Sequence, residues 1–307
     1  MELDFTKMHG TSNDFVVIDD LSEEHELSEE QVRFICDRHR GVGADGLILV
    51  RPPRVAGSAA YMHYLNHDGS LAEMCGNGVR CLAKYLVDRG FVAAREGQLV
   101  VDTLVGKRAI TFTVDGADLL LSATVDMGEP ILEPMEIPTT LKANSTTPAN
   151  LPLTAGLPMV AERELDTPLG KLAFTCLSMG NPHAVTFLNN PDDSLYALDI
   201  SQVGPAMEQS ELFPQKANIG FAQVRDPGGS DRPAELDLRV WERGVGETLA
   251  CGTGACAAVA AAALTGRIVP SALVRLRGGD LRIEWRGDGH LMMEGPAATV
   301  YEGTIRL

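Results

Sequence analysis

Two short segments combine a cysteine with a Gly-x-Gly motif, and both are followed by an apolar run. They are Glu73–Cys81 (EMCGNGVRC) and Leu249–Cys256 (LACGTGAC). Glycine permits tight turns and a close approach of a ligand to the main chain. The pattern after each motif is that of a helix that ends at a glycine. We therefore expect Cys75 and Cys251 at helix N-termini, where free N–H groups and the helix dipole favour an anion such as a carboxylate or a thiolate.

Two such sites in one chain suggest a pair of cysteines that face one substrate. One thiolate would remove a proton from a carbon atom, while the other cysteine, as a thiol, delivers a proton to the opposite face. A racemase or epimerase without a cofactor needs this arrangement, and no lysine context in the sequence indicates pyridoxal phosphate. The carbanion would be stabilised electrostatically by two helix N-termini that point at the carboxylate of the substrate.

The rival interpretations of the cysteines are structural. A free cysteine is often a small buried hydrophobe, which we expect for Cys81, Cys256, Cys36 and Cys176. A structural zinc site usually has about two to four residues between paired cysteines, whereas five residues separate the cysteines of the first motif and four those of the second. We expect no metal. A non-catalytic metal-binding or ligand-binding module is the alternative from another functional class, and metal analysis of the purified protein would decide it.

Length and composition set the broad class of the protein. The 307 residues are long enough for two domains, and their 45% apolar and 22% charged residues are typical of a soluble globular protein. A formal charge of −16 without a basic cluster argues against a nucleic-acid partner. The first residues, Met1–Phe5, lack a signal core, and the longest apolar run, 255–264, is shorter than the ~20 residues that span a bilayer. We therefore expect no membrane partner and a reducing cytoplasm.

The order of patterns along the chain predicts two duplicated halves. Strand-like runs are many and helical patterns are few, so each half should be a sheet wrapped around one central helix. Residues 129–158 contain six prolines and read as an extended connector at a domain boundary. Ser12–Val17 (SNDFVV) resembles Gly180–Val185 (GNPHAV), and each precedes a Cys-Gly-x-Gly motif by a similar distance. We expect the active site in the cleft between the halves.

Five motifs, taken in order, resemble those of the diaminopimelate epimerase family. They are HGTSNDF (9–15), CGNGVRC (75–81), MGNPH (179–183), NIGF (218–221), and WERG (241–244) with CGTGAC (251–256). The resemblance runs from Met8 to the last strands. It implies a cofactor-independent enzyme that interconverts LL- and meso-diaminopimelate, for lysine and peptidoglycan synthesis, and that is usually a homodimer.

The same resemblance implies an α/β (α+β) fold of two pseudo-symmetric domains. Each domain would be a mostly antiparallel β-sheet barrel around a central helix. We expect residues 1–125 and the C-terminal strand 296–307 to form the N-terminal domain, and residues 126–295 to form the C-terminal domain.

Carried over residue by residue, the resemblance assigns Cys75 and Cys251 as the acid/base pair. The two residues after each cysteine would bind the reacting α-carboxylate through main-chain amides, namely Gly76, Asn77, Gly252 and Thr253. The other substrate contacts that it implies are Asn13, Asn66, Asn181, Asn218, Glu242 and Arg243, with His183 in a supporting role. One departure concerns Gly46, because some members have Gln there; that side-chain contact would be absent or replaced by water.

A second enzyme class on the same fold stays open at this stage. It is another cofactor-free amino-acid racemase, acting for instance on histidine or on a proline derivative. Asn66, Asn181, Asn218 and Arg243 suit a second amino–carboxylate end of the substrate, which favours diaminopimelate. A substrate screen would separate the two possibilities.

Overall fold

The computed structural model describes residues 1–151, 155–188 and 195–307. The chain forms two compact units. The first comprises Met1–Asp126 together with Glu294–Leu307, and the second comprises Met127–Met293. The expected mixed α/β class is confirmed, since the described residues contain many strands and four α-helices, with more residues in strands than in helices.

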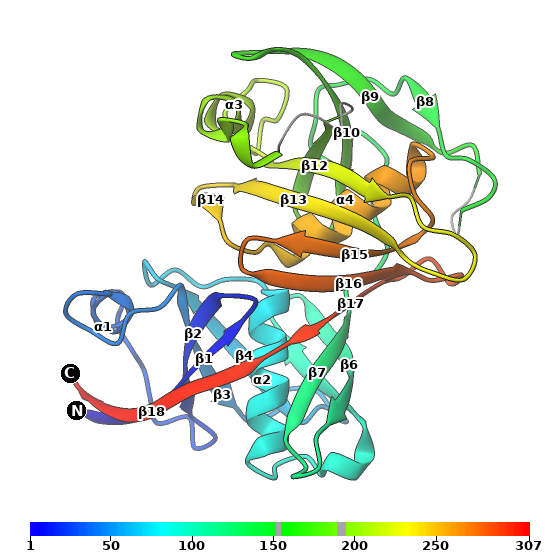
Figure 1. The fold of residues 1–307 in the computed structure, drawn as a ribbon. Coiled ribbons are helices and arrows are strands. Elements are labelled where there is room, and N and C mark those ends of the chain that lie inside the picture. Colours follow the sequence, from blue (N-terminus) through cyan, green and yellow to red (C-terminus); the bar gives the residue numbers. More distant parts are fainter. Residues whose placement is uncertain (152–154, 189–194) are drawn as a thin grey trace. The chain divides into compact units, whose positions relative to one another are not determined.

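The first unit is a curved sheet around one helix, α2 (Gly76–Asp88) (Figure 1). Its strands pair in the order β18, β1, β2, β3, β4, β5, β6 and β7. The β2–β3 and β4–β5 pairs are parallel, and the others are antiparallel. The strand bounds are Glu2–Gly10 (β1), Asn13–Asp19 (β2), Gly46–Arg51 (β3), Ala60–Asn66 (β4), Gln98–Thr103 (β5), Gly106–Val114 (β6), Leu120–Asp126 (β7) and Ala298–Arg306 (β18).

The second unit repeats this plan around α4 (Gly252–Leu264). Strands β10 to β13, β15 and β16 pair in chain order, with β11–β12 and β13–β15 parallel, and β8, β9 and β14 extend the set. Their bounds are Ser145–Thr146 (β8), Pro158–Thr167 (β9), Gly170–Ser178 (β10), Pro182–Phe187 (β11), Asn218–Asp226 (β12), Ala234–Glu242 (β13), Gly246–Thr248 (β14), Ser271–Leu276 (β15) and Gly279–Trp285 (β16). Strand β17 (Leu291–Pro296) carries the chain from the second unit into the first.

The two units therefore have the same alternation of parallel and antiparallel pairs, and their helices fall at the same points. Helix α1 (Glu29–Cys36) lies between β2 and β3, as α3 (Ile200–Glu208) lies between β11 and β12. Helix α2 follows β4, and α4 follows β13 and β14. Two short 3₁₀ helices, Ala94–Glu96 and Leu195–Ala197, complete the described helices. The internal repeat seen in the sequence is thus a repeat of topology.

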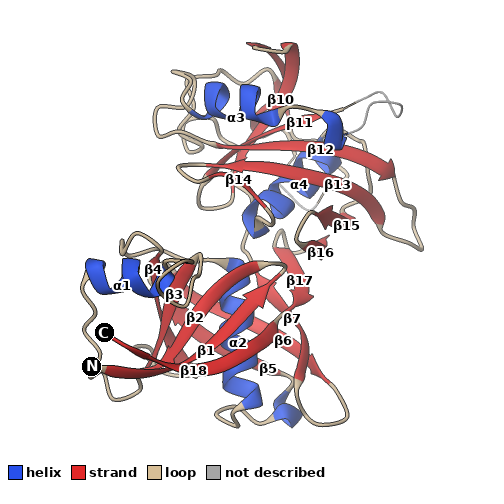
Figure 2. Cartoon of the chain, turned by 60° about the vertical axis from the view of Figure 1, so that its left-hand side comes forward, coloured by secondary structure: helices blue, strands red, loops and turns tan. Residues whose placement is uncertain are grey.

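Helices α2 and α4 are central, since nearly all of their residues are buried. All residues of α4 except Thr253 are buried, and its alanines allow strands to approach from several directions. In α2 only Lys84 and Asp88 are not buried, and they form an i,i+4 ion pair. Figure 2 shows each of these helices among the strands of its own unit.

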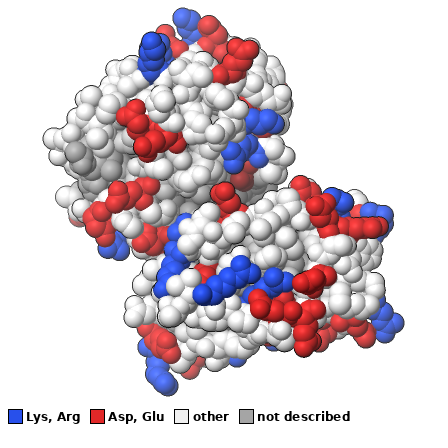
Figure 3. Space-filling view, turned by 180° about the vertical axis from the view of Figure 1, so that it is seen from behind, with Lys and Arg blue, Asp and Glu red and all other residues white. Residues whose placement is uncertain are grey.

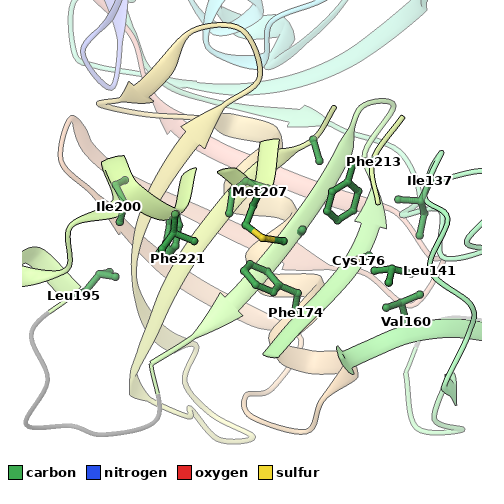
Figure 4. Close-up of a cluster of buried hydrophobic side chains, with 14 residues drawn as sticks. Ile137, Leu141, Val160, Phe174, Cys176, Leu195, Ile200, Met207, Phe213 and Phe221 are labelled. Atoms are coloured by element: carbon green, nitrogen blue, oxygen red, sulfur yellow. The ribbon is translucent and has the colours of Figure 1, made fainter. Parts of the chain in front are cut away.

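A second layer of core packs α3 against the sheet of its unit. Figure 4 shows Met207 of α3 near Phe174 and Phe221 on the strands, with Phe213 closing the cluster. All four side chains are buried. This apolar contact fixes α3, and with it the loops that follow β13.

Most charged side chains lie at the surface, in groups of mixed sign. On the face shown in Figure 3, acidic and basic side chains alternate over short distances. Among the helices of the described residues, none combines the length and the apolar character needed to cross a bilayer.

Helix α1 is shorter than its sequence pattern predicts. The sequence Ser28–Gln31 (SEEQ) has the form of a capping box and predicts a helix that runs to about His39. The capping box is present, but the helix ends at Cys36. The Asp37 carboxylate accepts the main-chain N–H groups of His39 and Arg40, at 2.8 and 3.0 Å. This local turn competes with the helix and ends it.

Gly204 of α3 offers a test of this packing. A Cβ atom there would lie 2.4 Å from Cγ and Cδ2 of Trp241. We expect Gly204→Ala to lower the free energy of unfolding by about 1–3 kcal/mol, because overpacking outweighs the better helix propensity of alanine. Urea unfolding followed by circular dichroism would measure this loss. Gly116→Ala, where a Cβ meets no atom within 4 Å, is the control, and equal stability of the two variants would contradict the prediction.

Candidate active site

The two cysteines of the Gly-x-Gly motifs occupy matching positions. Cys75 is the N-cap residue of α2 and Cys251 is the N-cap residue of α4, and each helix has 13 residues. Their backbones are extended and nearly identical, with φ −134° and ψ 118° at Cys75 and φ −127° and ψ 110° at Cys251. Each cysteine carbonyl accepts the first helical hydrogen bond, and the amides of the first helical turn are the groups that a helix N-terminus presents to an anion. The expectation of a cysteine at each helix start is confirmed.

The second glycine of each motif is required by close packing. A Cβ at Gly78 would lie 2.7 Å from Cε of Met62 on β4. A Cβ at Gly254 would lie 3.0 Å from Cγ2 of Val240 on β13 and 3.1 Å from Sγ of Cys251. The Gly-x-Gly pattern therefore seats each helix N-terminus tightly on its own sheet.

Cys75 faces a hydrogen-bond acceptor. Its Sγ lies 3.5 Å from Oδ1 of Asn13, the first residue of β2. The same oxygen accepts from Nδ2 of Asn77 at 3.4 Å. The structure thus brings together Asn13, Cys75 and Asn77, three of the residues predicted from the sequence.

Asn66 ends strand β4 and bonds elsewhere. Its Nδ2 donates to Oγ of Ser70 at 2.9 Å, and its main chain pairs with Gly46 on β3. A Cβ at Gly46 would lie 2.6 Å from Cε2 of Tyr64, so the Tyr64 ring fills the space in which a side chain at position 46 would begin. This neighbour explains why glycine stands at position 46.

The Sγ atom of Cys251 lies near two hydrogen-bond donors, Gly254 N–H and Thr253 Oγ1, and near the Glu242 carboxylate. The Sγ accepts from the Gly254 N–H at 3.4 Å and lies 3.6 Å from Oγ1 of Thr253. Burial and the nearby Glu242 carboxylate raise the pKa of Cys251 well above its ordinary value, and the Thr253 and Gly254 contacts oppose that rise. Glu242 is itself held by Oγ1 of Thr248 at 2.5 Å.

A line of hydrogen bonds connects Cys251 with β11. Asn181 Nδ2 donates to Oγ1 of Thr253 at 3.3 Å, and Asn181 Oδ1 lies 3.0 Å from Nε2 of His183. Burial and the Arg243 charge lower the pKa of His183 to about 3, so its ring is neutral near pH 7. No hydrogen-bond partner for His183 Nδ1 is found among the described residues. His183 thus orients the side chain of Asn181.

The remaining predicted residues of this unit lie beside His183. Asn218 pairs with His183 across the parallel β11–β12 ladder. The Asn218 Oδ1 accepts the Arg243 main-chain N–H at 2.9 Å, and its Nδ2 donates to Pro182 O at 3.1 Å. The side chain of Arg243 donates to Gln215 O at 3.2 Å. Glu242 and Arg243 follow directly at the end of β13.

The sequence did not single out the residues that hold these groups in place. Glu208, which ends α3, accepts the Gly244 N–H and Trp241 Nε1, both at 2.9 Å, and so clamps the loop of Glu242 and Arg243. The only sequence feature that could have indicated this role is the position of Glu208, a single acidic residue in an apolar helix pattern. Glu208 is 5% exposed, which shows that this acid serves an internal contact.

A further cluster lies behind Asn13 in the first unit. Asp14 forms ion pairs with Lys7 (2.6 Å) and Arg38 (2.7 Å), and Arg38 also reaches Asp45 (2.8 Å). Burial alone would raise the pKa of Asp14, but hydrogen bonds from Arg38 and Lys7 hold it well below its usual range. Burial and the Asp14 charge raise the pKa of Asp45. Asp14 and Asp45 are 31 residues apart in the sequence, so no local sequence pattern predicts their contact.

The other four cysteines are packing residues, as expected. Cys36, Cys81, Cys176 and Cys256 are all buried. Burial raises the pKa of Cys36, Cys81 and Cys176 to about 12 in each case. Within the described ranges, no group of three or more His, Cys, Asp or Glu side chains is placed to hold a metal ion.

The sequence matches a family model described as diaminopimelate epimerase over residues 5–133 and 175–300. The chain belongs to the diaminopimelate epimerase family. It is 45% identical to the diaminopimelate epimerase of Alkalilimnicola ehrlichii over 100% of both chains. It is 41% identical to that of Methanococcus maripaludis, over 98% of this chain and 99% of the relative.

Solved structures of lower identity share the fold. A hydroxyproline epimerase from Agrobacterium vitis superposes with a TM-score of 0.66 at 14% identity, covering 99% of this chain and 92% of that one. A Bacillus anthracis protein of the PhzF family superposes with a TM-score of 0.64 at 15% identity over 100% of both chains. At these identities the likeness concerns the fold alone.

The contact between Glu242 and Cys251 predicts a change in thiol reactivity. We expect Glu242→Gln to lower the pKa of Cys251, because removal of a nearby negative charge favours the thiolate. Alkylation of Cys251 at a fixed pH below its pKa should then be faster, measured by peptide mass spectrometry in a Cys75→Ala background. Glu247→Gln is the control, since Glu247 is paired with Arg239 and Arg277. An unchanged rate in Glu242→Gln would refute the prediction.

Proposed function

We propose that this protein is an epimerase that interconverts LL- and meso-diaminopimelate by proton transfer at the α-carbon, in lysine and peptidoglycan precursor synthesis. Membership of the family over almost the whole chain supports the substrate. One observation supports the mechanism. Cys75 and Cys251 are the N-cap residues of two central helices of equal length, and their backbone dihedral angles are nearly the same. A matched pair of thiols is what a two-base reaction needs.

The main-chain amides after each cysteine bind the reacting α-carboxylate. These are the first N–H groups of α2, at Gly76 and Asn77, and those of α4, at Gly252 and Thr253. Helix N-termini favour an anion, and they stabilise it more when charge spreads from the α-carbon into the carboxylate during the reaction. This stabilisation takes the place of an electron-withdrawing cofactor.

The proton transfer uses one thiolate and one thiol. The thiolate takes the α-hydrogen and becomes a thiol, and the C–H electron pair remains on the substrate as a carbanion. The opposite thiol then gives its proton to the other face of that carbon and becomes a thiolate. The product has the inverted configuration, and the two cysteines have exchanged protonation states. Neither Cys75 nor Cys251 has a fixed role, because the stereoisomer bound decides which one is the base.

The polar side chains around the two helix starts select the substrate. We assign Asn66, Asn181, Asn218 and Arg243 to the second amino–carboxylate end, and Asn13 and Glu242 to the reacting end, with His183 supporting Asn181. The hydrogen-bond line from His183 through Asn181 to Thr253 supports a preformed arrangement in the second unit. A site built from fixed amides rejects a substrate that lacks the matching groups.

The wider setting of the enzyme is part of the same proposal. The protein works without a cofactor, in the cytoplasm and as a homodimer. Residues 1–125 with 296–307, and residues 126–295, act as its two domains. The division of the chain into two compact units with the same topology supports this assignment.

A different amino-acid racemase on the same fold is the second candidate. The likeness to a hydroxyproline epimerase at 14% identity supports that candidate only through the fold. A panel of diaminopimelate, histidine and hydroxyproline isomers tests the choice, and turnover of histidine or hydroxyproline in preference to diaminopimelate would overturn it.

Substitution of either cysteine tests the two-base scheme. We expect Cys75→Ala and Cys251→Ala each to lower kcat for epimerisation by about 10²–10⁴-fold or more, because each removes one proton-transfer group. The rate of meso-diaminopimelate formation measures this. Cys256→Ala, a buried cysteine inside α4, is the matched control and should keep most of the activity. Full turnover by either N-cap variant would refute the scheme.

A further inference from the structure

The side-chain amides of Asn13 and Asn77, next to Cys75, lie in a chain of hydrogen bonds that has a charged group at each end. Arg80 Nη2 donates to Asn77 Oδ1 at 3.0 Å. Asn77 Nδ2 donates to Asn13 Oδ1 at 3.4 Å, and Asn13 Nδ2 donates to Asp45 Oδ2 at 2.9 Å. The chain thus runs from a guanidinium to a carboxylate, and Cys75 Sγ meets it at Asn13 Oδ1.

The charged ends allow only one direction for this chain. A guanidinium can only donate and an ionised carboxylate can only accept, whereas an amide has a donor on one side and an acceptor on the other. Arg80 therefore requires the oxygen of Asn77 to face it, and Asp45 requires the nitrogen of Asn13. If the Asn13 amide turned over, its oxygen would face the Asp45 carboxylate and its nitrogen would face the nitrogen of Asn77.

Both ends are themselves held in place. Arg80 is fully buried, and it also donates to Thr11 Oγ1 at 3.2 Å and to Pro296 O at 3.3 Å. Asp45 Oδ2 accepts a second hydrogen bond from the Asp14 main-chain N–H at 3.1 Å, and its Oδ1 accepts from Arg38. Neither end can turn away without breaking several contacts.

We propose that Arg80 and Asp45 are positioning residues that keep the Asn13 amide oxygen, rather than its nitrogen, directed at Cys75. This inference rests on the proposed function for its catalytic meaning, because it concerns the cysteine assigned as one of the two bases. An oxygen at this point accepts the S–H hydrogen bond of the thiol and gives no hydrogen bond to the thiolate. The chain therefore favours the protonated form of Cys75, with its S–H direction fixed.

Asp45 is the better end to test, because its side chain is 42% exposed and can be replaced without opening the core. Asp45→Leu removes the acceptor for Asn13 Nδ2. Asp45→Asn removes the same charge but keeps an oxygen, which the two N–H donors of Asn13 and Asp14 would hold at the Oδ2 position. The difference between these two variants reports the hydrogen bonds accepted at the Oδ2 position, from Asn13 and from the Asp14 main chain, without a difference in charge.

The other charges of the cluster are the same in both variants. They are Lys7 on β1, Asp14 on β2, Arg38 between α1 and β3, and Arg80 on α2. A difference in the behaviour of Cys75 between Asp45→Leu and Asp45→Asn therefore has no Coulombic origin in this cluster.

The measurement is the rate of Cys75 alkylation by iodoacetamide as a function of pH, in full-length protein with Cys251→Ser, read by peptide mass spectrometry. In Asp45→Leu only Asn77 still holds the Asn13 amide in its direction, so the amide turns more readily and donates to the thiolate. We expect its Cys75 to react about 2- to 10-fold faster than that of Asp45→Asn at low pH, the range that one hydrogen bond accounts for. Equal rates, or slower reaction in Asp45→Leu, would overturn the proposal.

Turnover gives a second readout and separates this inference from the proposed function. With Cys251 intact, Asp45→Asn should restore most of the kcat lost in Asp45→Leu, and a merely structural role would show no such rescue at equal thermal stability. Asp45→Ala replaces Asp45→Leu if the latter does not fold. If the wild-type protein does not epimerise diaminopimelate, the proposed function fails and the alkylation comparison still decides this inference. If it does and the two variants alkylate alike, this inference alone fails.

Discussion

The proposed chemistry depends on one constraint, which is the placement of a cysteine at the N-cap of a buried helix. The N-cap residue is extended, so its side chain lies beside the amides of the first helical turn. In the proposed reaction, one short segment thus supplies an acid/base group and a carboxylate site at a fixed distance from each other. The chain builds this segment twice, and the rest of each unit serves to hold it.

The two copies share a backbone but differ in the groups around sulfur. Cys75 meets an amide oxygen, whereas Cys251 meets a main-chain N–H, a hydroxyl group and the charge of Glu242. An epimerase has to work with either cysteine as the base, so the thiol and thiolate forms must be close in free energy at both positions. At Cys251 the Thr253 and Gly254 donors act in the direction of that requirement, because they oppose the rise in pKa that burial and the Glu242 carboxylate cause.

Sequence patterns predicted the elements that depend on local rules. The two helix starts, the topological repeat and the buried cysteines inside the helices followed from glycine positions and apolar periodicity, and the structure confirms them. The overlong prediction for α1 failed because the turn at Asp37 competes with the helix. The family match confirms the resemblance on which the substrate assignment was based.

The second layer of the site could not be predicted in the same way. Asp45 and Glu208 act through partners that are 32 and 33 residues away in the sequence. Such contacts depend on strand register and on the seating of α1 and α3, which no local pattern specifies. Arg80 was visible as a charge in an apolar helix, but its direction toward Asn77 is a property of the fold.

Hydrogen exchange at the α-carbon tests the central claim most directly. The reduced, metal-free protein is incubated with LL-diaminopimelate in D₂O without added cofactor, and deuterium content and stereochemistry are followed together. The two-base account predicts that the meso product carries solvent deuterium at the inverted carbon. Formation of meso-diaminopimelate without deuterium, or no reaction while another amino acid exchanges, would contradict it.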